Sequence, residues 1–106
     1  MSEAMIEIIE GSGNVYRDLG MEDADLRQLK ALLAAEIIRT LDARTMTVRD
    51  AAAQTGIAAA DYSRLRNVRL DRFTVDRLMI ILARLGKQVN LRVSVRPRKA
   101  ERAVAA

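Results

Sequence analysis

Arginine is the residue type with the clearest chemical use in this chain of 106 residues. Five arginines lie between Arg49 and Arg72. A guanidinium group binds phosphate oxygens, and the acceptor edge of guanine, through paired N–H donors. The same stretch holds hydroxyl and amide side chains, at Thr47, Ser63 and Asn67, that can also bind phosphates or base edges. These residue types predict recognition of a polyanion.

Catalysis and metal binding have few possible residues here. The chain contains no His and no Cys, so it lacks the commonest general base and the commonest zinc ligands. Ser, Lys, Asp and Glu are present, but no spacing indicates a Ser–Lys pair. With only three aromatic residues, the chain is also unsuited to stacking single-stranded RNA bases. We predict a protein that is not an enzyme and has no catalytic residue, cofactor or metal.

The charge is unevenly distributed along the chain. The overall charge of +4 is the sum of −5 in residues 1–24, +1 in residues 25–60 and +8 in residues 61–106. A basic body favours a polyanionic partner, whereas an acidic arm favours a basic partner. No basic start followed by an apolar run indicates a signal peptide, and no apolar stretch is long enough to span a membrane, so we expect a cytoplasmic protein.

The elements that must position the arginines follow from the apolar spacing. Apolar residues recur every three or four positions from Asp25 to Arg44, which predicts an amphipathic helix. Three further helices are predicted from cap and stop signals: Val48 to about Thr55, Ala58 to Arg66, and a helix from the Thr74 cap to Gly86. The last element, Val89 to Arg96, alternates apolar and polar residues and predicts a strand that Pro97 ends.

The second and third of these helices match the requirements of a helix-turn-helix. The spacing supplies a small residue, a glycine for the turn and three apolar anchors, in the order Ala52, Gly56, Ile57, Tyr62 and Leu65. The segment from Ala58 to Asn67 would then be the recognition helix, with its early residues in the major groove of DNA. A helical hairpin inside a plain bundle is the alternative.

The predicted DNA contacts are rich in arginine and poor in base-reading groups. Ala58, Ala59 and Ala60 offer only methyl contacts, so base reading would depend on Ser63 and Arg64. Asp61 would repel phosphate unless it pairs with Arg64 or accepts from cytosine. The full set predicted to bind DNA is Thr47, Arg49, Ala58, Ala59, Ala60, Ser63, Arg64, Arg66, Asn67, Arg69 and Arg72.

Two further surfaces complete the predicted organisation. A lone strand leaves backbone groups unsatisfied, so we expect antiparallel pairing with a second copy through Val89, Leu91, Val93 and Val95, and hence a palindromic operator. Residues 1–24 form an acidic arm before the 25–97 body, and residues 98–106 a basic flexible tail. The apolar residues near the start either dock on the C-terminal strand of the same chain or bind a partner.

Several stretches resemble one known family. They are the Gly11-to-Gly20 run, the helix around Ala35 to Ile38, the motif from Thr47 to Arg66, and the segment from Phe73 to Gly86, which together are similar to XRE-type helix-turn-helix antitoxins of the HigA-like group. The resemblance spans residues 6–96. It implies a mainly α fold of four to five helices with a lambda-repressor-like helix-turn-helix, in a homodimer that represses its own operon and neutralises a RelE-like ribonuclease toxin.

The resemblance also sharpens the role of the arm and marks three departures. It implies that the arm binds the toxin, with the apolar contacts supplied by Ile6, Ile8, Val15, Tyr16 and Leu19. Thr45 stands where the group often has Gly, Val48 where a phosphate-binding Gln is common, and Ala59 where a polar residue is usual. Two alternatives stay open: a stand-alone XRE-type repressor without a toxin, and a protein-interaction module whose helix-turn-helix has lost DNA binding.

Overall fold

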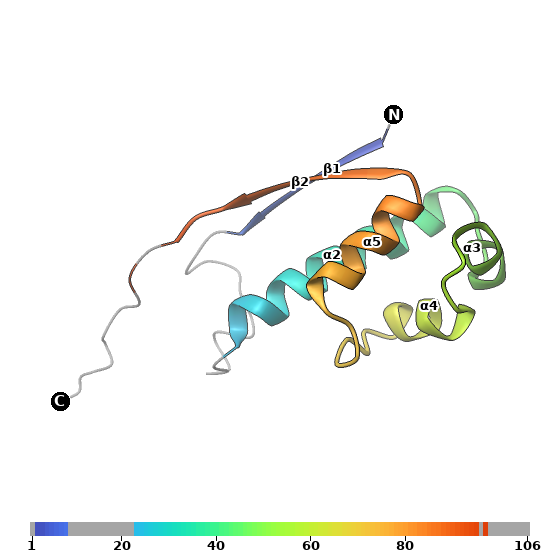
Figure 1. The fold of residues 1–106 in the computed structure, drawn as a ribbon, viewed down its shortest axis with the longest axis horizontal. Coiled ribbons are helices and arrows are strands. Elements are labelled where there is room, and N and C mark those ends of the chain that lie inside the picture. Colours follow the sequence, from blue (N-terminus) through green and yellow to red (C-terminus); the bar gives the residue numbers. More distant parts are fainter. Residues whose placement is uncertain (1, 9–22, 96, 98–106) are drawn as a thin grey trace.

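The computed structural model describes the backbone of residues 2–8, together with residues 23–95 and 97. In chain order the elements are β1 (Ser2–Ile8), α2 (Ala24–Ala43), α3 (Val48–Thr55), α4 (Ala59–Arg66), α5 (Val75–Arg84) and β2 (Lys87–Val93). Figure 1 shows the long helix α2 beside α5, with α3 and α4 at one end and the two strands as a ribbon along the helices. The predicted mainly α fold, with a helix-turn-helix and a C-terminal strand, is confirmed.

One apolar core joins all four described helices. Leu33, Ile37 and Leu41 lie on one stripe of α2, as the three-to-four spacing predicts, and are at most 1% exposed. Leu26 belongs to the same predicted stripe but is 46% exposed. The buried residues that meet this stripe are Ala51, Ile57, Tyr62, Leu65, Phe73, Leu78, Ile81, Leu82 and Leu85.

The two strands form a parallel pair within one chain. Ser2 lies opposite Lys87, and the register continues to Ile8 opposite Val93. Within a single chain, β2 therefore pairs with β1. This is the alternative in which the apolar residues near the start of the chain dock on its own C-terminal strand. The antiparallel neighbour predicted for β2 would come from a second copy and would need the other edge of the strand. The strand also ends at Val93, before the predicted end at Arg96.

Two helices end in a turn that places a β-branched residue in the left-handed region. After α2, Thr45 has φ 56°, and after α4, Val68 has φ 57°. In each case two backbone hydrogen bonds close the turn. After α2, the Met46 N–H donates to the Leu41 carbonyl and the Thr45 N–H donates to the Asp42 carbonyl. After α4, the Arg69 N–H donates to the Arg64 carbonyl and the Val68 N–H donates to the Leu65 carbonyl. This is the Schellman arrangement, whose left-handed position is normally glycine. Thr45 therefore occupies the position at which glycine was expected from the family resemblance.

Candidate DNA-binding surface

A capping box formed by Thr47 and Asp50 fixes the start of α3. The Thr47 side chain accepts from the Asp50 backbone N–H at 3.0 Å, and the Asp50 carboxylate accepts from the Thr47 N–H at 3.0 Å. Hydrogen bonding of the Asp50 carboxylate to the Thr47 backbone N–H, the largest cause, and to the Thr47 side chain holds the pKa of Asp50 below its usual value. Arg49 lies on the first turn of α3 and its side chain is exposed.

The turn between α3 and α4 depends on Gly56. Its φ of 79° is in the left-handed region, and its N–H donates to the Ala52 carbonyl at 2.8 Å. Any other residue there would be strained, so the glycine sets the angle at which α4 leaves α3. Ile57 follows and is buried, as the motif requires. Ala52 is only partly buried, and the small residue at the centre of the core is its neighbour Ala51, which is 0% exposed.

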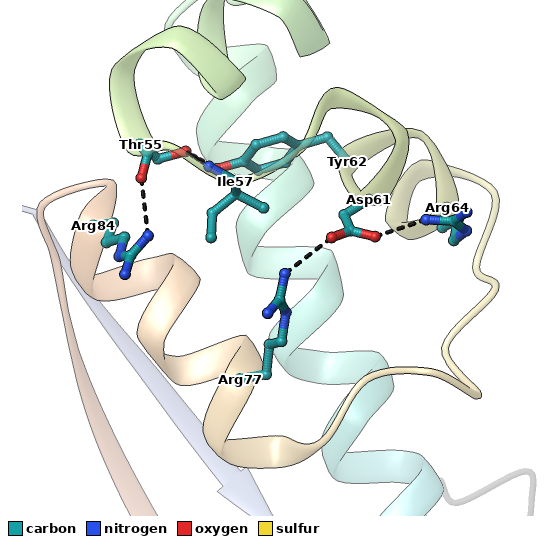
Figure 2. Close-up of polar contacts among 7 residues, drawn as sticks. All are labelled: Thr55, Ile57, Asp61, Tyr62, Arg64, Arg77 and Arg84. Carbon is teal, nitrogen blue, oxygen red and sulfur yellow. Dashed lines mark hydrogen bonds and ion pairs between the residues drawn. The ribbon is translucent and has the colours of Figure 1, made fainter.

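A buried polar cluster holds the two helices together beneath this turn. The Thr55 hydroxyl lies 2.6 Å from the Tyr62 hydroxyl, and it donates to the Ala51 carbonyl at 2.7 Å. The Ile57 N–H donates to the same hydroxyl at 3.3 Å. Burial raises the pKa of the Tyr62 phenol, so Tyr62 stays neutral and can hydrogen-bond. Figure 2 shows this cluster between α3 and α4.

Helix α5 contributes a cation to the same cluster. Arg84 donates from Nη1 to the Thr55 carbonyl at 3.1 Å, at the C-terminal end of α3 (Figure 2). A cation at this end of a helix satisfies a carbonyl that has no partner inside the helix and favours the helix dipole. The sequence reasoning assigned no role to Thr55 or Arg84, because a contact between residues 29 positions apart leaves no local pattern.

Asp61 ties the recognition helix to α5. Its carboxylate accepts from Arg64 Nη1 at 2.7 Å and from Arg77 Nη2 at 2.9 Å, as Figure 2 shows. Asp61 thus forms the pair with Arg64 that was given above as one of the two conditions under which its carboxylate would not repel phosphate. The same contact shows that Arg64, predicted to read bases, is held by a carboxylate and half-buried rather than freely extended.

The remaining arginines of the surface differ in their partners. Arg66 donates to the Asp42 carboxylate on α2 at 3.0 Å, which directs it toward α2. Within residues 23–95, no carboxylate lies within salt-bridge distance of Arg49, Arg69 or Arg72, and all three side chains are exposed. Unlike Arg64 and Arg66, which are paired with carboxylates, these three arginines present their guanidinium groups to solvent.

The other predicted DNA contacts lie on or beside α4. Ala58 caps the helix without a side-chain hydrogen bond, Ala58 and Ala60 are exposed, and Ala59 is half-buried. Ser63 is exposed, and Asn67 uses its amide Nδ2 to donate to the Ser63 carbonyl at 3.0 Å. Helix α4 therefore displays methyl groups at its start and polar groups in its second half.

The predicted dimer and toxin-binding residues are only partly described. On β2, Val89 packs partly buried against the core, whereas Leu91, Val93 and Val95 are 38%, 58% and 87% exposed. Ile6 and Ile8 lie in β1, opposite Leu91 and Val93. Val15, Tyr16 and Leu19 lie outside the described residues.

The described part of the chain offers neither a metal site nor a membrane-spanning helix. No group of three or more acidic residues there could hold a metal ion. None of the helices from α2 to α5 is long and apolar enough to cross a membrane.

Comparison with known proteins places this geometry in a family. A family model described as a helix-turn-helix domain matches residues 15–94. A solved structure described as a "Putative XRE Family Transcriptional Regulator" is similar, with 37% identity and a TM-score of 0.59 over 79% of this chain and 90% of that chain. Comparison with curated proteins gave no match. The matched region contains α2 to α5, and the chain belongs to the helix-turn-helix domain family, among the XRE-type transcriptional regulators.

Proposed function

We propose that this protein is a homodimeric repressor of its own operon that also neutralises a RelE-like ribonuclease toxin through its acidic N-terminal arm. The observation that carries the DNA-binding part is the set of exposed arginines without a carboxylate partner in residues 23–95, Arg49, Arg69 and Arg72, around the turn and the second helix of a helix-turn-helix. In this motif the second helix enters the major groove and the first crosses the backbone. The arginines then bind phosphates on both sides of α4.

The surface favours electrostatic binding with modest base reading. Ala58 caps helix α4 and Ala59 and Ala60 form its start, while its two arginines are paired with carboxylates, Arg64 with Asp61 and Arg66 with Asp42. Affinity should therefore depend strongly on salt, because phosphate contacts release counterions from DNA. Base preference would rest on Ser63 and on Arg64, with thymine methyl contacts from the alanines.

The proposed dimer uses the edge of β2 that β1 does not occupy. Leu91 and Val93 expose apolar surface on a strand that has only β1 as a described neighbour. Antiparallel pairing of two such strands would give a four-stranded sheet and place two α4 helices about 34 Å apart, the spacing of adjacent major grooves. A palindromic operator follows from that symmetry.

The toxin-binding role rests on charge and on the family resemblance. Residues 1–24 carry a charge of −5, which would attract the basic surface of a ribonuclease. The residues proposed to contact the toxin are Ile6, Ile8, Val15, Tyr16 and Leu19. A toxin would have to bind the outer side of β1 or displace β1 from β2, because the two strands are paired in the free chain.

One observation favours a second candidate, a stand-alone repressor. In the free chain β1 already has a role, since it pairs along the whole length of β2. A segment that completes its own sheet needs no toxin to explain its apolar residues. Co-expression with the protein encoded beside this gene separates the candidates: growth rescue and a stable complex support the antitoxin, and a neighbour without toxicity supports the stand-alone repressor.

The DNA-binding part is tested with a labelled duplex taken from the region directly upstream of the gene. We expect saturable binding at 50 mM salt, a palindromic footprint, and a loss of affinity of at least about tenfold at 200 mM salt. A shuffled duplex of the same composition should bind more weakly. Absence of binding to either duplex at 50 mM salt would support an interaction module with a degenerate helix-turn-helix.

A further inference from the structure

Val68 has an unfavourable backbone conformation for its residue type. It follows α4 directly and has φ 57°, in the left-handed region, where a β-branched side chain crowds its own backbone. Two backbone hydrogen bonds hold it there: Arg69 N–H to Arg64 C=O at 2.8 Å and Val68 N–H to Leu65 C=O at 3.1 Å. Glycine would make the same turn without strain.

The fold gives no reason for a valine at this position. The Val68 side chain is 64% exposed and does not belong to the core or to the apolar residues packed against it. In this loop the packing against the core comes from Leu70, which is partly buried, and from Phe73, which is buried. A strained residue that contributes nothing to packing is a candidate for a functional contact.

Val68 lies between two open hollows of the surface. The first, of about 540 Å³, is lined by Arg64, Arg69, Leu70, Asp71 and Arg72 in addition to Val68. The second, of about 250 Å³, lies toward the start of α2 and is lined by Asp23, Leu26, Arg27 and Lys30, together with Val68, Leu70 and Asp71. The apolar Val68 side chain lines both hollows and forms a ridge between them. Arg69 and Arg72 in the first hollow have no carboxylate within salt-bridge distance among residues 23–95, whereas Arg27 in the second is paired with Asp23 at 2.9 Å.

This arrangement matches the chemistry of a nucleic-acid backbone, which alternates charged phosphates with apolar sugar rings. Arg64 lines the first hollow and lies on α4, so the ridge is continuous with the DNA-binding surface. We propose that Val68 packs against a deoxyribose of the bound DNA, while Arg69 and Arg72 bind a neighbouring phosphate. This inference rests on the proposed DNA binding and assigns to Val68 an apolar, sequence-independent contact.

Three variants test the proposal with the full-length protein and the upstream duplex described above. Val68→Gly removes the side chain and the strain, so it should raise Tm by about 4 °C or more while weakening DNA binding about five- to tenfold. Val68→Leu keeps an apolar side chain and should bind within about twofold of the wild type. The loss for Val68→Gly should be equal on the upstream and shuffled duplexes, because a sugar carries no sequence information.

Thr45→Gly is the matched control. Thr45 has the same left-handed conformation after α2, so this change should also raise Tm, but it should leave DNA affinity unchanged. Wild-type affinity for Val68→Gly would overturn the proposal, as would a loss restricted to the upstream duplex, which indicates a base contact. If the wild type itself binds neither duplex at 50 mM salt, the proposed function fails before Val68 is tested.

Discussion

Asp61 Oδ2 accepts a hydrogen bond from Arg77 Nη2 at 2.9 Å, so the recognition helix α4 is joined to the first turn of α5 by an ion pair 16 residues apart in sequence. The other carboxylate oxygen of Asp61 holds Arg64. One acidic side chain therefore fixes the direction of a predicted base-reading arginine and anchors the helix that carries it. Its negative charge also lies on the surface proposed to meet phosphate.

Replacing Asp61 should make DNA binding tighter but less selective. Asp61→Asn removes a negative charge from the DNA-binding surface and releases Arg64 to bind any nearby phosphate. We expect the shuffled duplex to gain about threefold or more in affinity, and the ratio of upstream to shuffled affinity to fall. Fluorescence anisotropy at several salt concentrations measures both. Asp76→Asn removes one negative charge from the start of α5 outside this ion pair, and a similar loss of selectivity in that control would contradict the positioning role.

Arg64 and Arg69 should differ in what their loss does to binding. Arg64→Ala should cost about 1 to 3 kcal/mol and blur the base preference, because Arg64 lies on the recognition helix. Arg69→Ala should weaken upstream and shuffled duplexes alike and reduce the salt dependence, because a phosphate contact is independent of sequence. Unchanged selectivity in both variants would show that neither arginine reads bases.

The two hydroxyls of the buried cluster should contribute unequally to stability. Tyr62→Phe leaves the Thr55 hydroxyl with its bond to the Ala51 carbonyl, so the cost should be about 1 kcal/mol. Thr55→Val leaves the buried Tyr62 hydroxyl without this partner and removes the acceptor for the Ile57 N–H, so the cost should be about 2 kcal/mol or more. Urea unfolding of the two variants measures the difference, and a larger cost for Tyr62→Phe would be the contrary result.

The capping box should make stability sensitive to acid. The pKa of Asp50 is lower in the folded chain than in the unfolded chain. Its contribution to the free energy of unfolding is therefore fully present above the ordinary pKa of 3.8, and it is lost as pH falls through the pKa of the folded chain. Asp50→Asn should be less stable than the wild type at pH 7, and the difference in stability between the two proteins should narrow as pH falls toward 3. Urea unfolding midpoints at a series of pH values provide the measurement. A stability difference that is independent of pH would show that ionisation of Asp50 does not contribute to stability.

The local features of the fold could be predicted from sequence, and the contacts between elements could not. The bounds of α3, the Thr47 cap and the Thr74 cap follow from residue types within four positions of one another. The Arg84 contact with Thr55, and that of Arg77 with Asp61, depend on the packing angle of α5, which leaves no periodic signal. Thr45 and Val68 escaped prediction as left-handed residues because both are β-branched.

The sheet shows a second limit of sequence reasoning. The alternating pattern predicted a strand near Val89 to Arg96, but a pattern of period two carries no information on which strand lies beside it. The neighbour in the single chain is β1, from the opposite end of the sequence, in parallel register. Antiparallel pairing of the other edge of β2 with a second copy of the chain remains a separate prediction.

That prediction is tested by a charge on the exposed face of β2. Val93 is 58% exposed in the single chain, and the proposed dimer would cover it. Val93→Arg should then shift the protein from dimer to monomer in sedimentation and weaken operator binding, since one recognition helix replaces two. Arg92→Lys, on the neighbouring position of the strand, keeps the charge and serves as control. A Val93→Arg protein that stays dimeric would place the dimer interface elsewhere.

Removal of the N-terminal arm should separate the two proposed functions. The clustered core residues of the described helices lie between Leu33 and Leu85, and a chain that begins at Asp25 loses only Ala24 from the buried apolar residues of these helices, so it should still fold. It should bind the upstream duplex as well as the full chain or slightly better, because a charge of −5 has been removed from a DNA-binding protein. It should also lose some stability, because β2 loses its β1 neighbour.

In co-expression with the adjacent toxin, this chain should fail to restore growth, whereas a full-length Ile80→Ala variant, altered on α5 outside the arm, should restore it. Growth rescue by the shortened chain would place the toxin-binding surface on the helical body.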